Sequence, residues 1–392
     1  MTERQQAVKR PSLAALLRYF LRLGTLGFGG PIALAGHMEQ DLVERHGWIS
    51  AQEYKEGLAL AQLAPGPLAA QLAMYLGWVQ ARRLGATLVA LAFVGPSFVM
   101  VLILSELYVR FGGLPWMQGL FYGIGAAVIA IIARSVVRLV RMTLGRDQLL
   151  WALFTASELV TAWTESEIIW VFLLCGLIPM LLRGWKTRRP TPVLAFLPTV
   201  PGLATGLGGA ATVGVLWKIL AYFAGAGLFV FGSGLAIVPF LHGDVVRQFH
   251  WLTERQFIDA VAVSMITPGP VVITVAFIGY LVAGLAGATL AAIGVFLPVY
   301  LVVILVAPHF HRVAKNRRVK AFVDGVTAAA TGAIAGAAVI LGRRSLLDLP
   351  TILIALATLA LLLAPRKIPE PVLILAAGLV GLVLKGAGPA TG

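Results

Sequence analysis

Two Pro-Gly-Pro segments are the residues of this chain whose types and spacing point most directly to chemistry. The first, Pro65-Gly66-Pro67, lies inside an apolar run from about Leu58 to Trp78, and the second is Pro268-Gly269-Pro270. A proline lacks the N–H that a helix interior needs, so neither segment fits inside a regular helix. Backbone N–H and C=O groups that a helix break leaves without partners are tolerated in an apolar solvent only where they are buried in protein or line a water-filled cavity. Each break therefore predicts a binding site, and two in corresponding places predict a site shared by two repeats.

A helix that begins at such a break suits an anion. Pro67 and Pro270 fit the first position of the following helix, where a missing N–H has no cost. The N–H groups of the first turn and the positive end of the helix dipole then form an anion site. Neutral polar side chains near the breaks, which can hold and release an oxyanion, complete the predicted ligands: Gln62, Gln71, Ser264, Thr267 and Thr274. The alternative is a structural kink that neighbouring helices satisfy.

A glycine cluster precedes each break at the same distance. The first runs from Gly24 to Pro31 and includes Gly29 and Gly30; the second is Gly232-Ser233-Gly234. Glycines let another backbone or a ligand approach closely, which favours a place in the substrate site. Packing of helices through small residues, which is common in membranes, is the alternative.

Charged residues within or beside the apolar runs form a third set of candidates. Ionisable residues in membrane spans are usually functional, so Arg22 and Arg134 are predicted to attract the anion or to pair with an acid. Snorkelling to the interface is the alternative. A connector with Trp48 follows the first span and has a counterpart in the second half. Its acidic residues are candidates for gating or proton coupling, unless it is only a solvated amphipathic segment: Glu39, Asp41, Glu44 and Asp244.

The composition indicates which elements must position these residues. Of 392 residues, 59% are hydrophobic and 12% are charged, with a mean hydropathy of +0.89. Apolar runs of about 17 to 25 residues recur along the chain, which predicts an all-α polytopic membrane protein. The net charge of +14 comes from basic residues between spans, so it indicates topology and no nucleic-acid partner. The single Cys175 and the spacing of the histidines predict no metal site, and we expect no cofactor.

The two halves of the chain repeat each other with a constant spacing. Gly24 aligns with Gly227, Trp48 with Trp251, and the two Pro-Gly-Pro segments with each other. We therefore expect two homologous helical repeats, residues 13–189 and 213–386, joined by residues 190–212 as a linker or an extra span.

Basic loops change place between the repeats, which indicates that the halves insert in opposite directions. Arg82 and Arg83 follow the second span of the first half, whereas the corresponding loop of the second half is uncharged and the next one carries Arg312 to Lys320. Inversion requires an odd number of crossings before the second repeat, so we expect 12–14 spans, with 13 as the best estimate, and a cytoplasmic N-terminus. A parallel repeat of twelve spans is the alternative.

These residues carry a resemblance to the chromate ion transporter family. It rests on FLRLGTLGFGGP (Phe20 to Pro31) and QLAPGPLAAQLAMYLGW (Gln62 to Trp78) in the first half. FGSG, WLTERQFIDAV and TPGPVVITVAFIGY carry it in the second half, so nearly the whole chain resembles the long two-domain form. The resemblance implies proton-motive-force-driven export of chromate from the cytoplasm across the inner membrane. One departure is Leu34, where many relatives have His or Gln.

The sequence thus predicts a secondary transporter that exports a divalent oxyanion by alternating access around two broken helices, and the resemblance makes chromate the expected substrate and chromate resistance the outcome. Transport of sulfate or another inorganic anion by the same fold is the alternative. An intramembrane hydrolase is disfavoured because no histidine base or pair of aspartates lies within a span, and a pore because the broken helix repeats. The expected partners are the oxyanion and the lipid bilayer, and a homodimer is left open.

Overall fold

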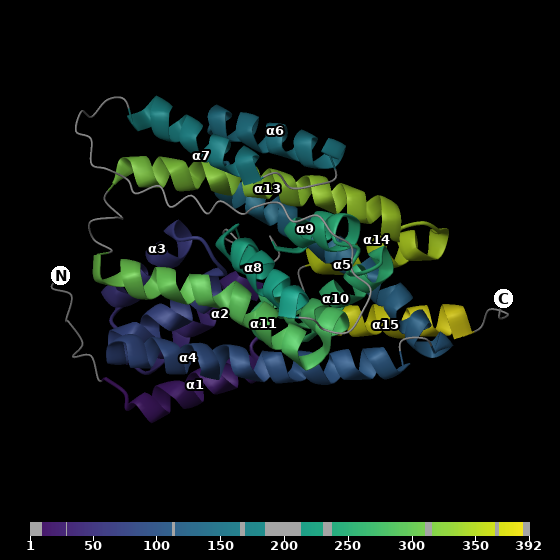
Figure 1. The fold of residues 1–392 in the computed structure, drawn as a ribbon, viewed down its shortest axis with the longest axis horizontal. Coiled ribbons are helices and arrows are strands. Elements are labelled where there is room, and N and C mark those ends of the chain that lie inside the picture. The colour runs from purple at the N-terminus through teal and green to yellow at the C-terminus, as the bar shows by residue number, and fades with distance from the viewer. Residues whose placement is uncertain are drawn as a thin grey trace.

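The computed structural model describes residues 10–28, 30–111, 114–164, 169–184, 213–229, 237–309, 316–364 and 368–386. All regular elements in these ranges are helices (Figure 1). Four stretches are long and apolar enough to cross a membrane: Leu68–Phe111, Pro115–Thr143, Val271–His309 and Arg317–Ser345. Residues 190–212, predicted as a linker or an extra span, lie outside the described ranges.

Within its described residues, the first half contains seven α-helices and one π-helical segment. The chain runs through α1 (Leu13–Leu26), α2 (Gly30–Met38), the π-helical Glu39–Arg45, α3 (Ala51–Leu63), α4 (Leu68–Phe111), α5 (Pro115–Thr143), α6 (Gln148–Thr164) and α7 (Ile169–Gly184).

The second half follows the same order. The chain runs through α8 (Val213–Phe229), α9 (Ile237–His242), the π-helical Gly243–Gln248, α10 (Glu254–Ile266), the 3₁₀ turn Val271–Ile273, α11 (Thr274–Val306), the 3₁₀ turn Ala307–His309, α13 (Arg317–Ser345), α14 (Leu349–Leu363) and α15 (Glu370–Gly386).

The predicted repeat appears in the bounds of the helices. α10 begins and ends 203 positions after α3, and α13 begins and ends 202 positions after α5. The sequence dictates the start of α3 and α10 locally, because each begins with a capping box, Ser50 with Glu53 and Thr253 with Gln256. Equivalent residues also turn the chain back within α4 and α11. α4 reverses at Arg82 (φ 50°), so that Gly77 packs on Gly85, and α11 reverses at Gly284 (φ 58°), so that Gly279 packs on Gly287. The repeat is therefore a property of the backbone as well as of the sequence.

The chain reverses direction at the first Pro-Gly-Pro segment. Gly57 of α3 packs against the ring of Tyr75 in α4. Nearer the outer end of the pair, Arg10 binds both the Glu53 carboxylate (2.7 Å) and the Val79 carbonyl (3.1 Å). α3 and the part of α4 before Arg82 are thus the two arms of a re-entrant hairpin with Pro65-Gly66-Pro67 at its tip. The broken helix expected in the apolar run from Leu58 to Trp78 is corrected to a hairpin, because Gly66 at φ +131° turns the backbone back instead of kinking it.

α1 and α2 form a second hairpin in the same half. The Tyr19 hydroxyl donates to the carbonyl of His37 (3.2 Å), and Leu34 of α2 packs beneath Gly27 at the end of α1. The tip of this hairpin lies between Gly27 and Gly30, so the glycine cluster and the Pro-Gly-Pro segment are both hairpin tips.

Beyond its kink, α4 packs antiparallel to α11. The hydroxyls of Thr87 and Tyr300 are 2.8 Å apart. Farther along α4, Glu106 accepts from the hydroxyl of Tyr280, which lies beside the beginning of the second part of α11 because Gly279 packs on Gly287. α5 and α13 are antiparallel as well, because Ile129 lies beside Gly342 and Leu139 packs on Ile334. Corresponding long helices of the two repeats therefore run in opposite directions.

The repeats exchange their last two helices. α6 and α7 pack on α13 of the second half, and α14 and α15 pack on α5 of the first (Figure 1). The contacts are equivalent, since a Cβ on Gly123 would lie 1.9 Å from the carbonyl oxygen of Ala377 and one on Gly325 would lie 2.1 Å from that of Cys175. The helices of the two repeats therefore interlock in space, and the boundaries 13–189 and 213–386 stay a prediction.

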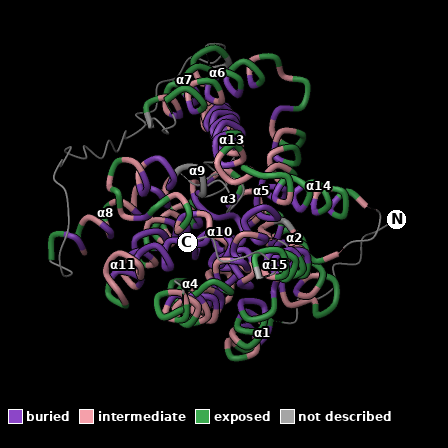
Figure 2. Tube along the Cα trace, turned by 90° about the vertical axis from the view of Figure 1, so that its right-hand side faces the viewer, coloured by how far each residue is buried: buried purple, intermediate pink, exposed green. Residues whose placement is uncertain are grey.

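The buried residues gather in the middle of the molecule and the apolar surface faces outward. Figure 2 shows α13 and α10 largely buried in the interior, with exposed residues along the outer sides of α1, α4 and α14. Large apolar side chains are exposed on α4, α11, α14 and α15, for example Leu91, Leu285, Leu305, Leu356 and Leu379. Soluble monomers rarely expose apolar surface on this scale, so the outer helices suit lipid.

We predict that Gly123→Ala destabilises the protein, because its Cβ would force α15 away from α5. The expected loss is about 1–3 kcal/mol, the usual cost of overpacking. Gly95→Ala on α4 is the matched control, since a Cβ there meets no atom within 4 Å. Thermal unfolding in detergent micelles measures both, and equal stability of the two variants would contradict the packing described.

Candidate functional site

The tip of the second Pro-Gly-Pro hairpin binds the glycine turn of the first half. The Gly269 N–H donates to the carbonyl of Gly27 at 2.9 Å. The hydroxyl of Ser97 in α4 lies between the two turns, 2.7 Å from the Pro268 carbonyl and 3.3 Å from that of Gly24. Two motifs about 240 residues apart in the sequence therefore meet in one place, and α4 holds them together.

Only glycine fits at the centre of either break. Gly269 has φ +96°, and a Cβ on it would lie 2.0 Å from the Ser97 hydroxyl. Gly66 has φ +131°, and its Cβ would lie 2.6 Å from Nε2 of Gln71. A positive φ and close contacts combine at both positions, so the close approach that the sequence predicted is present at each tip.

Gln71 stabilises the first tip from within. Its Nε2 donates to the carbonyls of Ala64 (3.3 Å) and Pro65. The side chain is fully buried, and its Oε1 has no hydrogen-bond partner among the described residues. Because the break leaves carbonyls unsatisfied, the amide serves the turn, and direct contact of Gln71 with a substrate stays a prediction.

The predicted hydroxyl ligands of the second half bond to their own backbone. Ser264, Thr267 and Thr274 donate to the carbonyls of Val261, Val263 and Val271, each at 2.7 Å. All three are buried. An oxyanion needs donors, and these donors are already engaged, so their role as ligands also stays a prediction.

A cavity of about 780 Å³ lies beside the first tip. Gln62, Leu63 and Leu68, which flank the break, form part of its wall, as do Gly30 and Pro31 at the beginning of α2. The N-termini of α2 and α4 therefore border the same space. The opposite wall comes from the end of α5 and the beginning of α13, one helix from each half.

Five charged side chains line this cavity. Arg138 and Lys320 are cationic, and Glu39, Asp324 and Glu370 are acidic. The carboxylate of Glu370 also lies 3.8 Å from the guanidinium of Arg134, so Arg134 pairs across the halves, as the sequence allowed, and does not itself line the cavity.

Sequence reasoning selected Glu39 from these five side chains and missed the other four. One signal was available: Arg138 lies one turn after Arg134, hence on the same face of α5. Lys320 carried no such signal, because it was counted only among the basic residues of its loop.

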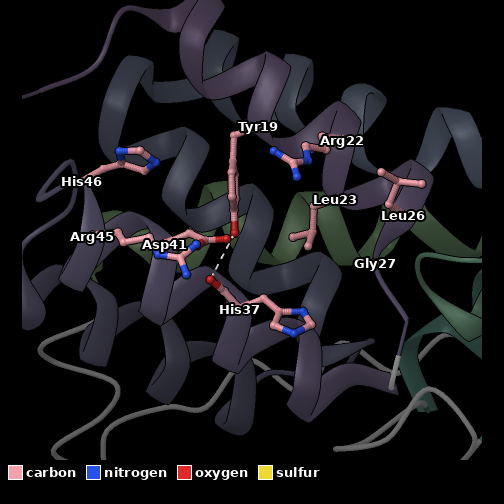
Figure 3. A pocket seen from close by; sticks show the side chains of 9 residues that line it. All are labelled: Tyr19, Arg22, Leu23, Leu26, Gly27, His37, Asp41, Arg45 and His46. Carbon is pink, nitrogen blue, oxygen red and sulfur yellow. Dashed lines mark hydrogen bonds and ion pairs between the residues drawn. The ribbon is translucent and has the colours of Figure 1, made fainter. Parts of the chain in front are cut away.

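A second cavity of about 320 Å³ lies between α1 and the α2 hairpin arm. Figure 3 shows the side chains around it, which include Tyr19, Arg22, His37, Asp41 and His46. Arg45 lies 3.0 Å from the Asp41 carboxylate. The structure thus places the predicted residues Arg22 and Asp41 together, apart from the cavity beside the first tip.

The remaining predicted residues divide between connectors and undescribed segments. Glu44 is exposed, whereas Asp244 is largely buried and burial raises the pKa of its carboxyl to about 6. A coupling role for either stays a prediction.

Leu34, at the position that is polar in many relatives, packs in the core with 1% exposure and faces neither cavity. Gly29, Gly232, Ser233 and Gly234 lie outside the described residues.

We predict that Gly269→Ala abolishes transport while the protein still inserts, because the methyl group would separate the second tip from Ser97 and Gly27. Gly145→Ala is the matched control: Gly145 also has a positive φ (49°), but a Cβ there meets no atom within 4 Å. Solute flux in reconstituted vesicles, normalised to inserted protein, measures both. Flux through the Gly269→Ala variant equal to that of the control would contradict the prediction.

Several known proteins are similar in sequence to this chain. The chain is 58% identical to a chromate transport protein of Cupriavidus metallidurans over 95% of this chain and 93% of that protein. It is 52% identical to a probable chromate transport protein of Synechococcus elongatus (95% of each chain) and 32% identical to a chromate transport protein of Pseudomonas aeruginosa (96% and 94%). No solved structure matches the chain.

The sequence pattern of the chromate transporter family matches residues 14–180 and 217–382, one match in each half. The two matches coincide with the two structural repeats, and the apolar helices cross a membrane several times. The chain is a multi-pass membrane protein and belongs to the chromate transporter family.

Proposed function

We propose that this protein is a secondary transporter that exports chromate from the cytoplasm across the inner membrane and thereby confers chromate resistance. The observation that carries the proposal is the cavity with Arg138 and Lys320 beside the first Pro-Gly-Pro tip, in a chain 58% identical to a chromate transport protein. Radiolabelled chromate flux in proteoliposomes, with and without a pH gradient, is the experiment that tests it.

The charges around the cavity suit a dianion that must be released again. Arg138 and Lys320 supply positive charge, and the N-termini of α2 and α4 add the positive ends of two helix dipoles. Glu39, Asp324 and Glu370 oppose them. Because these carboxylates compete for the same cations, the cavity would attract the oxyanion without holding it too tightly.

Alternating access would use the tips as the moving parts. The second tip is tied to the first half by the hydrogen bond from Gly269 to Gly27 and by Ser97. Few bonds need to break there for one hairpin to move against the other half. In this proposal the anion passes from the cavity to the backbone N–H groups that follow Pro67 and Pro270.

Opposed insertion of the halves has a geometric basis. A two-fold axis that relates two antiparallel neighbours is perpendicular to them, and α4 with α11 and α5 with α13 are such pairs. If these helices cross the bilayer, the axis lies in the membrane plane, as in inverted-repeat transporters. The proposal includes a cytoplasmic N-terminus and a crossing within residues 190–212.

Transport of sulfate or another inorganic anion is the alternative function. Arg138, Lys320 and the helix N-termini could bind any small dianion, and nothing in the lining of the cavity distinguishes chromate from sulfate, which has the same charge and tetrahedral shape. Competition by sulfate against labelled chromate separates the two.

We predict that Arg83 and Arg317 lie on the cytoplasmic face and Arg110 on the opposite face, as inverted repeats require. Single cysteines at these exposed positions, in a Cys175→Ser background, would be labelled with an impermeant maleimide in intact cells and in inverted vesicles. Labelling of residues 83 and 317 from opposite faces would rule out inversion.

We predict that Arg138→Gln and Lys320→Gln each raise the KM for chromate about 10- to 100-fold, because each removes a charged hydrogen bond of roughly 1.5–3 kcal/mol. Arg141→Gln is the control, since Arg141 is exposed on the same helix but does not line the cavity. Unchanged KM in both cavity variants would show that the anion binds elsewhere.

A further inference from the structure

A buried carboxylate lies in α10, which leads to the second Pro-Gly-Pro segment, away from both cavities. Asp259 of α10 is 4% exposed, and the hydroxyl of Tyr108 in α4 donates to its Oδ2 at 2.7 Å. Among the described residues, no cation lies within ion-pair distance of this carboxylate. A charge removed from water without a counter-ion is costly, so such a group is retained where it has a task.

The other charged and titratable groups around α10 face other partners. Arg255, one turn before Asp259 on α10, is exposed and donates to the carbonyl of Gln118 in α5 (3.3 Å). Other charged and titratable side chains on the facing helices have partners elsewhere. Tyr122 of α5 hydrogen-bonds to Asp348, and the ammonium of Lys385 of α15 lies over the Tyr122 ring. Tyr280 of α11 hydrogen-bonds to Glu106, and Glu370 of α15 pairs with Arg134. Tyr108 itself is held by the rings of Phe121 and Phe277. Arg255 acts on the charge of Asp259 only from a distance, so among the described residues the Tyr108 phenol is the group that bonds directly to this carboxylate.

The internal repeat supplies a comparison within the molecule. Glu56 of α3 is the counterpart of Asp259, but it is half-exposed and bonds to Gln52 and Tyr75 within its own hairpin. Asp259 instead bonds to a helix of the other half. Only the second of these equivalent acids combines burial with a bond between the halves.

We propose that Asp259 is the residue whose protonation couples proton movement to anion transport, an inference that rests on the proposed transport function. The Tyr108 hydroxyl bonds to the carboxylate through a charge-assisted hydrogen bond, roughly twice as strong as a neutral one. When Asp259 takes up a proton, this bond weakens and α10 is freed from α4. α10 leads directly to the tip at Gly269, so the loosened hairpin can leave Gly27.

The proton follows a simple course. It passes from water to an Asp259 oxygen on the side of Tyr108, which is half-buried, and converts the carboxylate to the acid. After the hairpin has moved, Asp259 releases the proton to the opposite side and regains its charged bond to Tyr108. One proton enters and one leaves for each cycle of this residue.

Two flux measurements on the full-length protein in proteoliposomes test the proposal. Exchange of labelled for unlabelled chromate needs no net proton movement, whereas accumulation driven by a pH gradient does. We expect Asp259→Asn to keep exchange and to lose gradient-driven accumulation about tenfold or more, as for a lost charged hydrogen bond. Glu56→Gln is the matched control and should keep both. Asp259→Asn with undiminished gradient-driven accumulation would overturn the proposal.

A second variant decides the case in which Asp259→Asn loses both activities. Tyr108→Phe keeps the ring packing and removes only the hydroxyl that stabilises the carboxylate. We expect the pH of half-maximal gradient-driven transport to move upward in this variant, and an unchanged pH profile would refute the coupling role. If the unaltered protein moves no chromate, the proposed function itself fails. Chromate movement that ignores the pH gradient would refute only the role of Asp259.

Discussion

The structure depends on how broken backbone is satisfied in an apolar environment. A turn inside a membrane protein exposes N–H and C=O groups that lipid cannot bond. Here the Gly269 N–H finds the Gly27 carbonyl, Ser97 serves the carbonyls of Pro268 and Gly24, and Gln71 serves those of Ala64 and Pro65. Such short-range bonds require the turns to approach each other closely, which accounts for glycine at the centre of each tip. The same requirement explains why residues chosen as substrate ligands are largely occupied by the protein itself.

Interlocking of the two repeats follows from this arrangement. The second tip binds the first half, and the last two helices of each half pack on the central helix of the other, α5 or α13. Neither half therefore buries its own interior alone. A hairpin held by a few bonds within such a frame is a natural moving part, because its arms are rigid helices and its tip contacts are few.

Differences between the repeats carry information that their similarity does not. Equivalent kinks have Arg82 in one half and Gly284 in the other, and equivalent acids are the half-exposed Glu56 and the buried Asp259. The cavity is likewise built unequally: the first-half tip and α2 border it, whereas α13 contributes Lys320 and Asp324. In the export proposed above, such unlike charges would let the two similar halves play different roles.

The sequence by itself determined the membrane class, the two repeats, the capping boxes and the position of both breaks. These features depend on composition, on local backbone preferences and on spacing, which are read directly along a chain. It also indicated Gly30, Gln62 and Glu39, which line the large cavity, and the pairing of Arg134. Only the tertiary structure decided that the breaks are tips of hairpins and that the donors of Gln71, Ser264, Thr267 and Thr274 are engaged. It also decided that Arg138 and Lys320 line the large cavity and that Asp259 is buried. Those outcomes depend on contacts between residues far apart in the chain, and a hydrogen-bond donor that suits an anion suits a nearby carbonyl equally well until the fold brings one of them within reach.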